Sequence, residues 1–460
     1  MHEKHLSRRD MLTTGLAGAM FASGAAASAA PAPTAGRATE TAYSTEVLVV
    51  GGGPAGMAAA SMAARLGCKV LLTERYGRMG GMAVQGMVGP LMGSVKSPFV
   101  DEVLQRIGGR HFDSERLDLQ YASIVRKSGA KLLLHSWAAE VCVEDHRVTG
   151  VRLVSKQGMI RVTAPIIVDA TGDGDVAALA GAAFEQGRTG DGLVQPVSIM
   201  YRLAGVDEKR ALVCGSEEEA HKVRVPEGTW CEVVTRGQKS GELASTIGVI
   251  RLYRASRLGE RVVNATQVNG IDGTKVEDLT RAELECREQA YQVLDFVRKH
   301  APGYEKAYVA AMPMTVGVRE TRRILGVQYL TRDDCTSGRK WPDAVVRSAS
   351  FPIDIHNPSG SGQAEGEGPQ GRAARVNPYD IPYGCLVPRK IDGLLLAGRC
   401  ISGSHDAHAS YRVQCIAMAI GAAAGAAAAT ALKQDVLPRT VDVAQVQTAL
   451  GAEDLAGVCR

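Results

Sequence analysis

The sequence predicts an α/β protein in which one parallel sheet is built from two separate stretches of chain. Residues 46–74 contain, in order, a short apolar run, a glycine-rich turn, an Ala- and Met-rich helix and a second apolar run. Two more short apolar runs, at 164–169 and 393–398, are typical of buried strands. From about 191 to 383, polar and apolar residues alternate in several segments. This order indicates a mixed α+β part inserted into the sheet-forming part.

The composition is that of a globular chain without a bias toward nucleic acid. Its 460 residues are 45% hydrophobic, which is enough for two or more domains. The formal net charge is only +4 and no basic stripe is present, so we expect no nucleic-acid partner. The ten cysteines form no C-x-x-C pair, and no metal-ligand spacing occurs. We therefore expect no metal site and favour buried free thiols, with disulfides as the alternative.

The N-terminus has the three parts of an export signal in order. Ser7-Arg8-Arg9-Asp10-Met11-Leu12 resembles a twin-arginine box, an Ala- and Gly-rich apolar stretch follows to residue 27, and Ala27-Ser28-Ala29 offers a cleavage site. We expect a twin-arginine signal peptide at 1–30 and a linker at 31–43. The twin-arginine machinery carries folded proteins, so this signal predicts a periplasmic or secreted protein that takes up a cofactor before export.

Local patterns predict the remaining elements. We expect helices within 86–130 and strands at 131–134, 140–143, 148–154 and 159–163. A further helix is expected at 281–300, with an apolar face formed by Leu284, Ala290, Tyr291, Leu294 and Val297. We also expect a Gly- and Ser-rich loop at 357–377 and a polar tail at 436–460. The helix from about Val413 to Leu432 is long enough to cross a membrane. Because its Ala and Gly residues are weakly hydrophobic and it contains Gln414, we expect it to pack inside the protein, without stable membrane insertion of the mature chain.

The turn after the first strand has the spacing Gly51-x-Gly53-x-x-Gly56, which binds a dinucleotide where it joins a strand to a helix. Gly51 permits the tight turn, Gly53 leaves room for the pyrophosphate, and Gly56 lets helix and strand pack closely. The N–H groups at the helix start face the phosphates, and Glu74, after the second strand, accepts hydrogen bonds from the ribose. The residues that we expect to bind the dinucleotide are Gly51, Gly53, Pro54, Ala55, Gly56, Glu74 and Arg75.

Further motifs resemble one family of flavoproteins. They are Gly80-Gly81, Val168-Asp169-Ala170-Thr171-Gly172-Asp173-Gly174-Asp175, Val318-Arg319-Glu320-Thr321-Arg322-Arg323-Ile324, Asp354-Ile355-His356 and Leu396-Ala397-Gly398-Arg399-Cys400-Ile401-Ser402. Over 44–432 the chain resembles the bacterial FAD-dependent oxidoreductases of the glutathione-reductase-like superfamily. The resemblance implies a Rossmann-like FAD/NAD(P)-binding fold with FAD as cofactor. It also implies an FAD-binding domain formed by 44–190 and 384–435, and an inserted substrate domain at 191–383.

The same resemblance implies further residues around FAD, namely Gly80, Gly81, Thr171, Gly172, Asp173, Gly398, Arg399, Val413 and Gln414. Many flavoproteins of the superfamily place an Asp after the glycine that corresponds to Gly398, where it binds the ribityl hydroxyls. Here that position is Arg399, so we do not transfer the role of the Asp. The helix from Val413 would aim its positive end at the flavin, where it stabilises the negative charge of the reduced form.

The sequence Gly172-x-Gly174-x-x-Ala177 imitates a second dinucleotide turn, but no strand that ends in an acidic residue follows it. We therefore expect no separate nicotinamide domain and predict a dehydrogenase or oxidase. It would pass hydride from a small organic substrate to flavin N5 and be reoxidised by oxygen, a quinone or a separate redox protein. Two alternatives remain open: a reductase of an unsaturated acid fed by a respiratory partner, and a flavin-binding partner protein with little turnover.

Polar residues near the last strand are the candidates for substrate chemistry. His405 and His408 lie between the apolar run 393–398 and the late helix, where such folds bind ligands, and imidazole suits proton removal, so we predict them to be catalytic. The predicted substrate-binding residues are His356, Arg319, Tyr411 and Arg412. Arg319 belongs to a charged run with Glu320, Arg322 and Arg323. For this run we favour a buried ion-pair network over binding of a substrate carboxylate.

Overall fold

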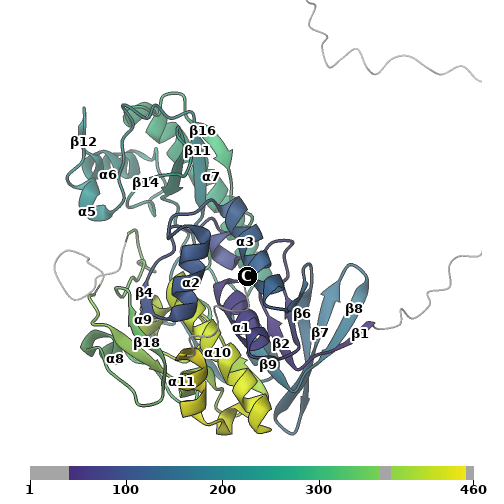
Figure 1. Ribbon diagram of the computed structural model, residues 1–460. Helices are drawn as coiled ribbons and strands as arrows, with labels where there is room; N and C mark the ends of the chain where they lie inside the picture. The colour runs from purple at the N-terminus through teal and green to yellow at the C-terminus, as the bar shows by residue number, and fades with distance from the viewer. Residues whose placement is uncertain (1–40, 363–373, 452–460) are drawn as a thin grey trace, which may run out of the picture. The chain divides into compact units, whose positions relative to one another are not determined.

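A five-stranded parallel sheet organises the first of two hydrophobic cores in the computed structural model, which describes residues 41–362 and 374–451 (Figure 1). Its strand order is β20-β9-β2-β3-β5, and all neighbours are parallel. The strands are β2 (Val47–Val50), β3 (Val70–Thr73), β5 (Lys131–Leu133), β9 (Ile166–Asp169) and β20 (Leu394–Leu396). Because Leu394 pairs with Ile167, the late strand joins the early ones. The predicted assembly of one sheet from two stretches of chain is confirmed.

Several predictions concern residues outside those that the structure describes. They are the signal peptide at 1–30, the linker as far as residue 40, part of the predicted loop at 363–373, and the end of the predicted tail at 452–460, which includes Cys459.

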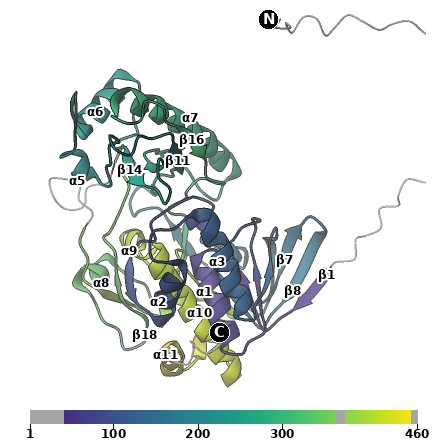
Figure 2. The ribbon, with the colours of Figure 1, turned by 45° about the horizontal axis from the view of Figure 1, so that its top comes forward.

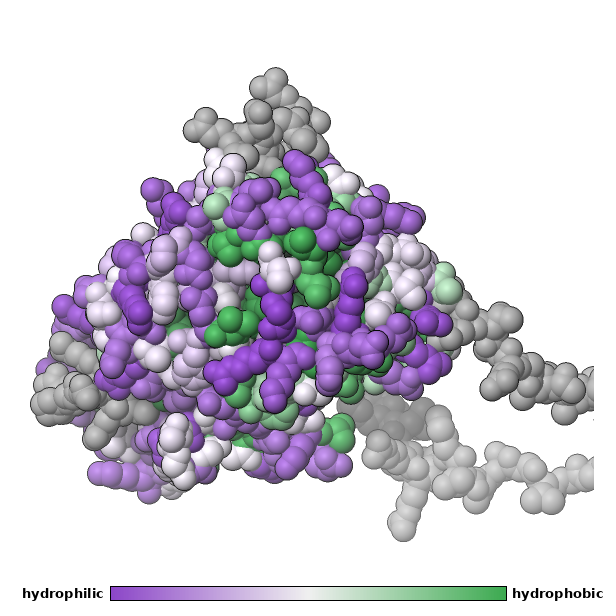
Figure 3. Space-filling view, turned by 90° about the horizontal axis from the view of Figure 1, so that it is seen from below, coloured by the Kyte–Doolittle hydropathy of each residue, from purple (hydrophilic) through white to green (hydrophobic). Residues whose placement is uncertain are grey.

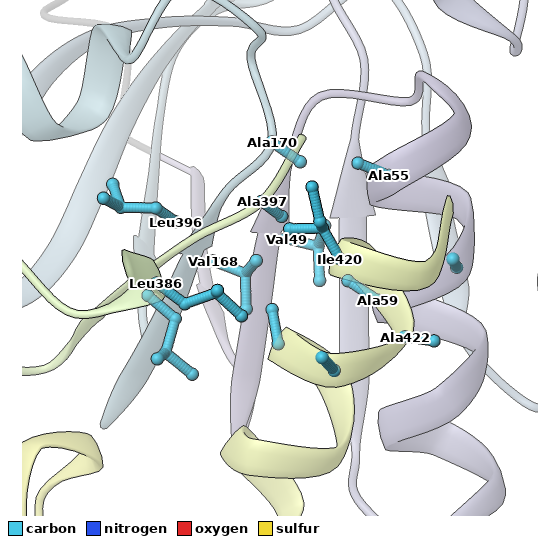
Figure 4. Close-up of a cluster of buried hydrophobic side chains, with 14 of the residues drawn as sticks. Val49, Ala55, Ala59, Val168, Ala170, Leu386, Leu396, Ala397, Ile420 and Ala422 are labelled. Carbon is cyan, nitrogen blue, oxygen red and sulfur yellow. The ribbon is translucent and has the colours of Figure 1, made fainter. Parts of the chain in front are cut away.

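Two helices that are far apart in the sequence pack together beside this sheet. α1 (Pro54–Arg65) follows β2, and α10 (Gln414–Gln434) lies near the end of the chain. A Cβ on Gly421 would lie 2.0 Å from the carbonyl oxygen of Ala55, and one on Gly425 would lie 2.3 Å from that of Ala59. Small residues therefore let the two helix backbones approach closely. Figure 4 shows Ala55 and Ala59 of α1 near Ile420 and Ala422 of α10.

Within the described residues, α10 is the one helix that is long and apolar enough to span a membrane by length and composition. In the protein, 94% of this apolar stretch is buried. The prediction that the helix packs inside the protein is confirmed. On the face that Figure 3 shows, hydrophilic residues surround a smaller area of hydrophobic ones.

The strands predicted at 140–143, 148–154 and 159–163 form most of a second sheet with the order β1-β8-β7-β6, whereas the strand predicted at 131–134 is β5 of the parallel sheet. Its strands are β1 (Thr41–Ser44), β6 (Trp137–Glu144), β7 (Arg147–Ser155) and β8 (Gly158–Thr163). β1 pairs parallel with β8, and the other pairs are antiparallel. Val148, Val151 and Leu153 of β7 are fully buried in the first core, so this sheet packs against the parallel one.

The second core lies under an antiparallel sheet with the order β14-β15-β11-β16 (teal in Figures 1 and 2). Its strands are β11 (Met200–Ala204), β14 (Arg251–Arg254), β15 (Arg261–Asn264) and β16 (Tyr308–Ala311). Alternate residues such as Tyr201, Leu252 and Val263 point into this core. The helices that contribute buried residues to it include α6 (Trp230–Ser240) and α7 (Val276–His300).

The apolar face predicted for α7 is partly wrong. Leu284 and Tyr291 are 56% and 55% exposed, whereas Cys286 and Val293 are fully buried. The buried face also includes Gln289, whose side chain bonds to the backbone of Gln267. Apolar spacing alone did not reveal which face meets the sheet, because this helix has apolar residues on both sides.

The second core ends at Val316, although the sequence places all of 191–383 in one inserted domain. Most buried hydrophobic residues between Ile324 and Tyr383, such as Leu330 and Val346, belong to the first core instead. The elements of this segment are β17 (Arg322–Ile324), α8 (Arg332–Ser337), β18 (Ala344–Ser350) and β19 (Tyr379–Pro382). β18 pairs with β19 and with β4 (Ser94–Lys96), which ties the segment to the early part of the chain.

The remaining elements are mostly short. They are α2 (Pro98–Ile107), α3 (Ser114–Lys127), α4 (Asp175–Leu179), α5 (Glu217–Ala220), α9 (His405–Tyr411), α11 (Val443–Gly451), β10 (Phe184–Gln186), β12 (Arg224–Val225), β13 (Gly228–Thr229), and the 3-10 turns η1 (Gly81–Ala83), η2 (Tyr383–Leu386) and η3 (Pro438–Thr440).

Candidate active site

One cavity of about 1130 Å³ extends from the carboxyl ends of the parallel strands to the antiparallel sheet of the second core. Gly51 and Gly53, which follow β2, line one end. Met200, Tyr253 and Asn264, from three strands of the antiparallel sheet, line the other. Open α/β sheets bind ligands at the carboxyl ends of their strands, so the position of this cavity is that of a ligand site.

The three glycines of the turn after β2 have three different surroundings. Gly51 has φ +107°, and a Cβ there would lie 2.3 Å from the carbonyl oxygen of Ala170. A Cβ on Gly56 would lie 1.8 Å from the carbonyl oxygen of Gly51. By contrast, the nearest atom to a Cβ on Gly53 would be 3.8 Å away, because this position faces the cavity. A dinucleotide pyrophosphate fits this cradle, since α1 begins at Pro54 without a side-chain cap and presents free N–H groups.

Glu74, after β3, is held in place by the backbone and lines the same end of the cavity. Its two carboxylate oxygens accept hydrogen bonds from the N–H of Gly52 at 2.6 Å and of Tyr76 at 2.9 Å. Burial raises the pKa of Glu74, and these hydrogen bonds oppose the rise. Each oxygen keeps a second lone pair, so the carboxylate can accept further bonds from a ribose.

Arg399 connects the turn after β20 with the turn after β9. Its guanidinium forms an ion pair with Asp173, which also accepts a hydrogen bond of 2.8 Å from the Thr321 hydroxyl. Burial alone would raise the pKa of Asp173, but the charges of Arg399 and Arg75 outweigh it and hold that pKa below its usual value. Arg399 lines the cavity and Asp173 does not, so the carboxylate fixes the arginine from behind.

Most residues that the sequence predicts for FAD line the cavity: Gly51, Gly53, Pro54, Ala55, Glu74, Arg75, Gly81, Thr171, Gly172, Gly398, Arg399, Val413 and Gln414. Gly56, Gly80 and Asp173 do not. Gly80 instead donates its N–H to the carbonyl oxygen of Gly52 at 2.8 Å. These three positions shape the wall from outside.

A cluster of charged side chains lines the far end of the cavity. Arg251, Arg319, Asp354, His356 and Arg412 all lie on its surface, although they come from distant parts of the sequence. A guanidinium nitrogen of Arg412 lies 3.1 Å from the backbone oxygen of Asp354 and 3.4 Å from its carboxylate. The His356 ring lies 3.7 Å from the same carboxylate. The structure thus brings together Arg319, His356 and Arg412, three of the four predicted substrate-binding residues.

Burial sets the protonation of this cluster. Burial and the charge of Arg319 lower the pKa of His356 well below 6.5, so the ring is neutral at pH 7. Burial and the charge of Arg412 lower the pKa of Arg319 to about 9, which still leaves it a cation. Burial would raise the pKa of Asp354, but the charges around it, including those of Arg412 and Arg319, hold it below 3.8. At neutral pH the cluster therefore contains an ionised aspartate and a neutral histidine.

The structure does not place His405, His408 or Tyr411 on the cavity surface. They belong to α9, where they are 7%, 1% and 0% exposed, rather than to a loop beside the cavity. His405 Nδ1 lies 2.9 Å from the Glu320 carboxylate, and the Tyr411 hydroxyl donates to the carbonyl oxygen of Ile401 at 2.9 Å. The sequence identified the right segment, but the helix turns these side chains inward.

The charged run from Arg319 to Arg323 contains both ion-paired residues and one residue that lines the cavity. Arg323 forms a buried ion pair with Glu320, and Arg322 lies 2.9 Å from Asp175. These contacts are the ion-pair network that the sequence favours. Arg319 alone of the run faces the cavity, where it donates to the carbonyl oxygen of Pro196 at 2.6 Å.

Sequence reasoning missed the cavity-lining residues of the second core. Arg251 pairs with Asn264, and Asn264 pairs with Met200, so one row across three strands faces the cavity. Tyr253 lies two residues after Arg251 and faces the same way. The alternation of Arg251, Leu252 and Tyr253 was the available signal, but it does not identify the polar face as a site.

Within the described residues, no group of three His, Cys, Asp or Glu side chains is placed to hold a metal ion. The nine cysteines found there are free thiols, and most are buried.

A dinucleotide cradle on a parallel sheet, open to a second, charged chamber, is the arrangement of an α/β dinucleotide-dependent enzyme. Residues 46–450 match the family model described as FAD dependent oxidoreductase. The chain belongs to this family, and FAD is its cofactor.

Comparison with individual proteins supports no finer assignment. Thiamine thiazole synthase from Methanococcus aeolicus is 31% identical over 144 residues, which cover 28% of this chain and 54% of that protein. The chain thus spans about half the length of the relatives it matches. A geranylgeranyl bacteriochlorophyll reductase-like protein from Thermoplasma acidophilum is 14% identical with a TM-score of 0.45, covering 89% of this chain and 82% of that one. A flavin-dependent brominase is 11% identical with a TM-score of 0.47, covering 89% and 83%.

Proposed function

We propose that this FAD-dependent oxidoreductase dehydrogenates a small organic substrate that enters the chamber beneath the antiparallel sheet. The observation that carries the proposal is the continuity of one cavity, from Gly53 at the dinucleotide cradle to Tyr253 and Arg319 at the charged end. Bound FAD supplies the two-electron acceptor. The side chains of the chamber bind and orient the substrate and hold a proton, while the antiparallel sheet limits access of water.

We assign proton removal to His356. Its ring lines the cavity, is neutral at pH 7, and has the Asp354 carboxylate 3.7 Å away to stabilise the charge that it gains. Its backbone N–H donates to Gln195 Oε1 at 3.3 Å, which fixes the segment. His405 and His408, which the sequence favours for this role, then act as positioning residues, because they are buried behind the cavity wall.

The test is an anaerobic screen of the FAD-loaded protein. Loss of the oxidised-flavin absorbance is followed after addition of hydroxy acids, amines, sugars, polyols and ring alcohols. Reduction by one class supports a dehydrogenase or oxidase, and oxygen, a quinone and a redox protein are then compared as acceptors. If no compound reduces the flavin in any class, the proposed direction of electron flow is wrong.

A second candidate is a reductase of an unsaturated acid that receives electrons from a respiratory partner. The positive charges of Arg319 and Arg412 in the chamber favour it, since such a substrate carries a carboxylate. Protein reduced with a dye and mixed with unsaturated acids distinguishes the two: reoxidation by the acid supports the reductase.

We also propose that the protein is exported by the twin-arginine machinery and acts in the periplasm or outside the cell, as the Arg8-Arg9 motif predicts. Replacing both residues with Lys should leave a folded, flavin-loaded precursor in the cytoplasm. Unchanged export of the double variant, measured by cell fractionation, would contradict the assignment.

A further inference from the structure

We propose that the charged end of the cavity binds a single carboxylate of the substrate, held between Arg319 and Arg412. This inference rests on the proposed function in taking the chamber as the substrate site. It names the substrate class as small organic monocarboxylates, whichever way the electrons flow.

The two arginines reach the same chamber from different elements. Arg319 lies on the segment between β16 and β17, and Arg412 lies between α9 and α10. Arg319 donates to a backbone oxygen, that of Pro196, at 2.6 Å. Arg412 contacts Asp354, yet its Nε is buried and has no hydrogen-bond partner among the residues that the structure describes. A buried donor without a partner is costly, so this atom indicates a group that arrives from the cavity.

The charges of the cluster point to one missing anion. Arg251 lies 3.4 Å from Glu217, so this pair is balanced. Asp354 is then the carboxylate that Arg319 and Arg412 share, and the charge of each arginine acts on it. Because His356 is neutral, one positive charge of this cluster has no counter-ion within the described part of the chain. An excess charge in a buried site is unfavourable until an anion binds, and a guanidinium holds a carboxylate through two parallel hydrogen bonds.

The surfaces next to the arginines suit the body of a small organic acid. Val318 and Phe351 supply apolar contact, while Tyr253 and Asn264 supply polar groups. Arg399, at the FAD end, already has Asp173 as its partner, so the excess charge lies at the charged end.

The experiment measures binding to the oxidised, FAD-loaded protein, independent of turnover. The probes are lactate, benzoate and cinnamate, each compared with its primary amide, which has nearly the same shape without the charge. Binding is followed by the change in flavin absorbance and by calorimetry. We expect at least one acid to bind, and to bind at least about tenfold more tightly than its amide.

Three variants locate the site. Arg319→Gln should weaken binding of the acid about ten- to a hundredfold and leave amide binding unchanged, and Arg319→Lys should restore part of the loss. Arg254→Gln is the matched control: Arg254 is on the same strand as Arg251, but its side chain is 67% exposed and pairs with Glu208. It should bind the acids like the parent. FAD content and melting temperature confirm that each variant is folded.

Equal affinity for each acid and its amide, including no measurable binding of either, would overturn the carboxylate site. The carboxylate site would also be overturned if Arg319→Gln lost FAD while its flavin-loaded fraction bound the acids as before, because the charge of Arg319 would then bind the cofactor. The proposed function fails separately. If acids bind but exchange no electrons with the flavin in either direction, the carboxylate site is supported and the proposed redox function is contradicted. If only neutral compounds reduce the flavin, the redox function is supported and the carboxylate site is contradicted.

Discussion

The two ends of the cavity are built in different ways. At the FAD end, the turn from Gly51 to Gly56 offers the backbone N–H groups at the start of α1, and its side chains are small or absent. At the charged end, Arg251, Arg319 and Arg412 come from segments far apart in the sequence and act through their side chains. A site made of backbone needs particular residues at fixed spacing, while a site made of side chains needs only that the fold bring them together.

The largest effect should come from Gly56→Val, at the packed part of the turn. A Cβ there would lie 1.8 Å from the backbone oxygen of Gly51, which cannot move without disturbing β2 and α1. Overpacking usually costs about 1–3 kcal/mol and more when backbone must shift, so we expect little soluble, folded protein. Circular dichroism and soluble yield measure this. Normal yield and melting temperature would mean that the turn is not constrained by packing.

Gly53→Val should separate FAD binding from folding. Gly53 has φ −71°, and a Cβ there meets nothing within 3.8 Å. The variant should therefore fold and melt like the FAD-free parent, yet bind FAD at least about a hundredfold more weakly, because the side chain fills the pyrophosphate position. Yellow protein with full FAD content would show that the pyrophosphate lies elsewhere.

At the charged end, His356→Gln should slow anaerobic flavin reduction by about a hundred- to ten-thousandfold at normal FAD content. His408→Ala is the comparison, since His408 is buried behind the wall. It should lower the melting temperature but change the reduction rate per bound flavin only a few-fold. Stopped-flow measurement of the rate of flavin reduction, with the substrate found in the screen, distinguishes the two residues. If His408→Ala slowed flavin reduction more than His356→Gln, the proton acceptor would lie in α9.

A smaller effect distinguishes two buried aspartates by pH. Burial raises the pKa of Asp169, at the FAD end, to about 6, although Thr171 and Ala177 donate hydrogen bonds to it. Folded protein therefore binds a proton more tightly than unfolded protein, and the contribution of Asp169 to stability is present at low pH and lost as pH rises toward 6. The cations around Asp354 lower its pKa, so its contribution is instead lost as pH falls below 3.8.

We expect the unfolding free energy of the parent, relative to Asp169→Asn, to fall by about 2–3 kcal/mol between about pH 4 and about pH 7. Urea unfolding at several pH values measures the difference, and using the difference cancels the other titrating groups. A flat difference would mean that Asp169 is ionised throughout this range.

The sequence by itself determined the FAD end. The Gly51–Gly56 turn, Glu74, the strands in order and the buried α10 could all be predicted, because glycine spacing, apolar runs and the end of a strand are local properties. Only the tertiary structure decided which side chains form the charged end of the cavity. The sequence offered Arg319 and His356 as candidates. It could not decide whether Arg319 binds substrate or joins an ion-pair network, or prefer His356 to His408, until the fold fixed which side chains face the cavity. The direction of a side chain depends on the packing of its element against others, and packing is set by contacts between residues that are distant in the sequence.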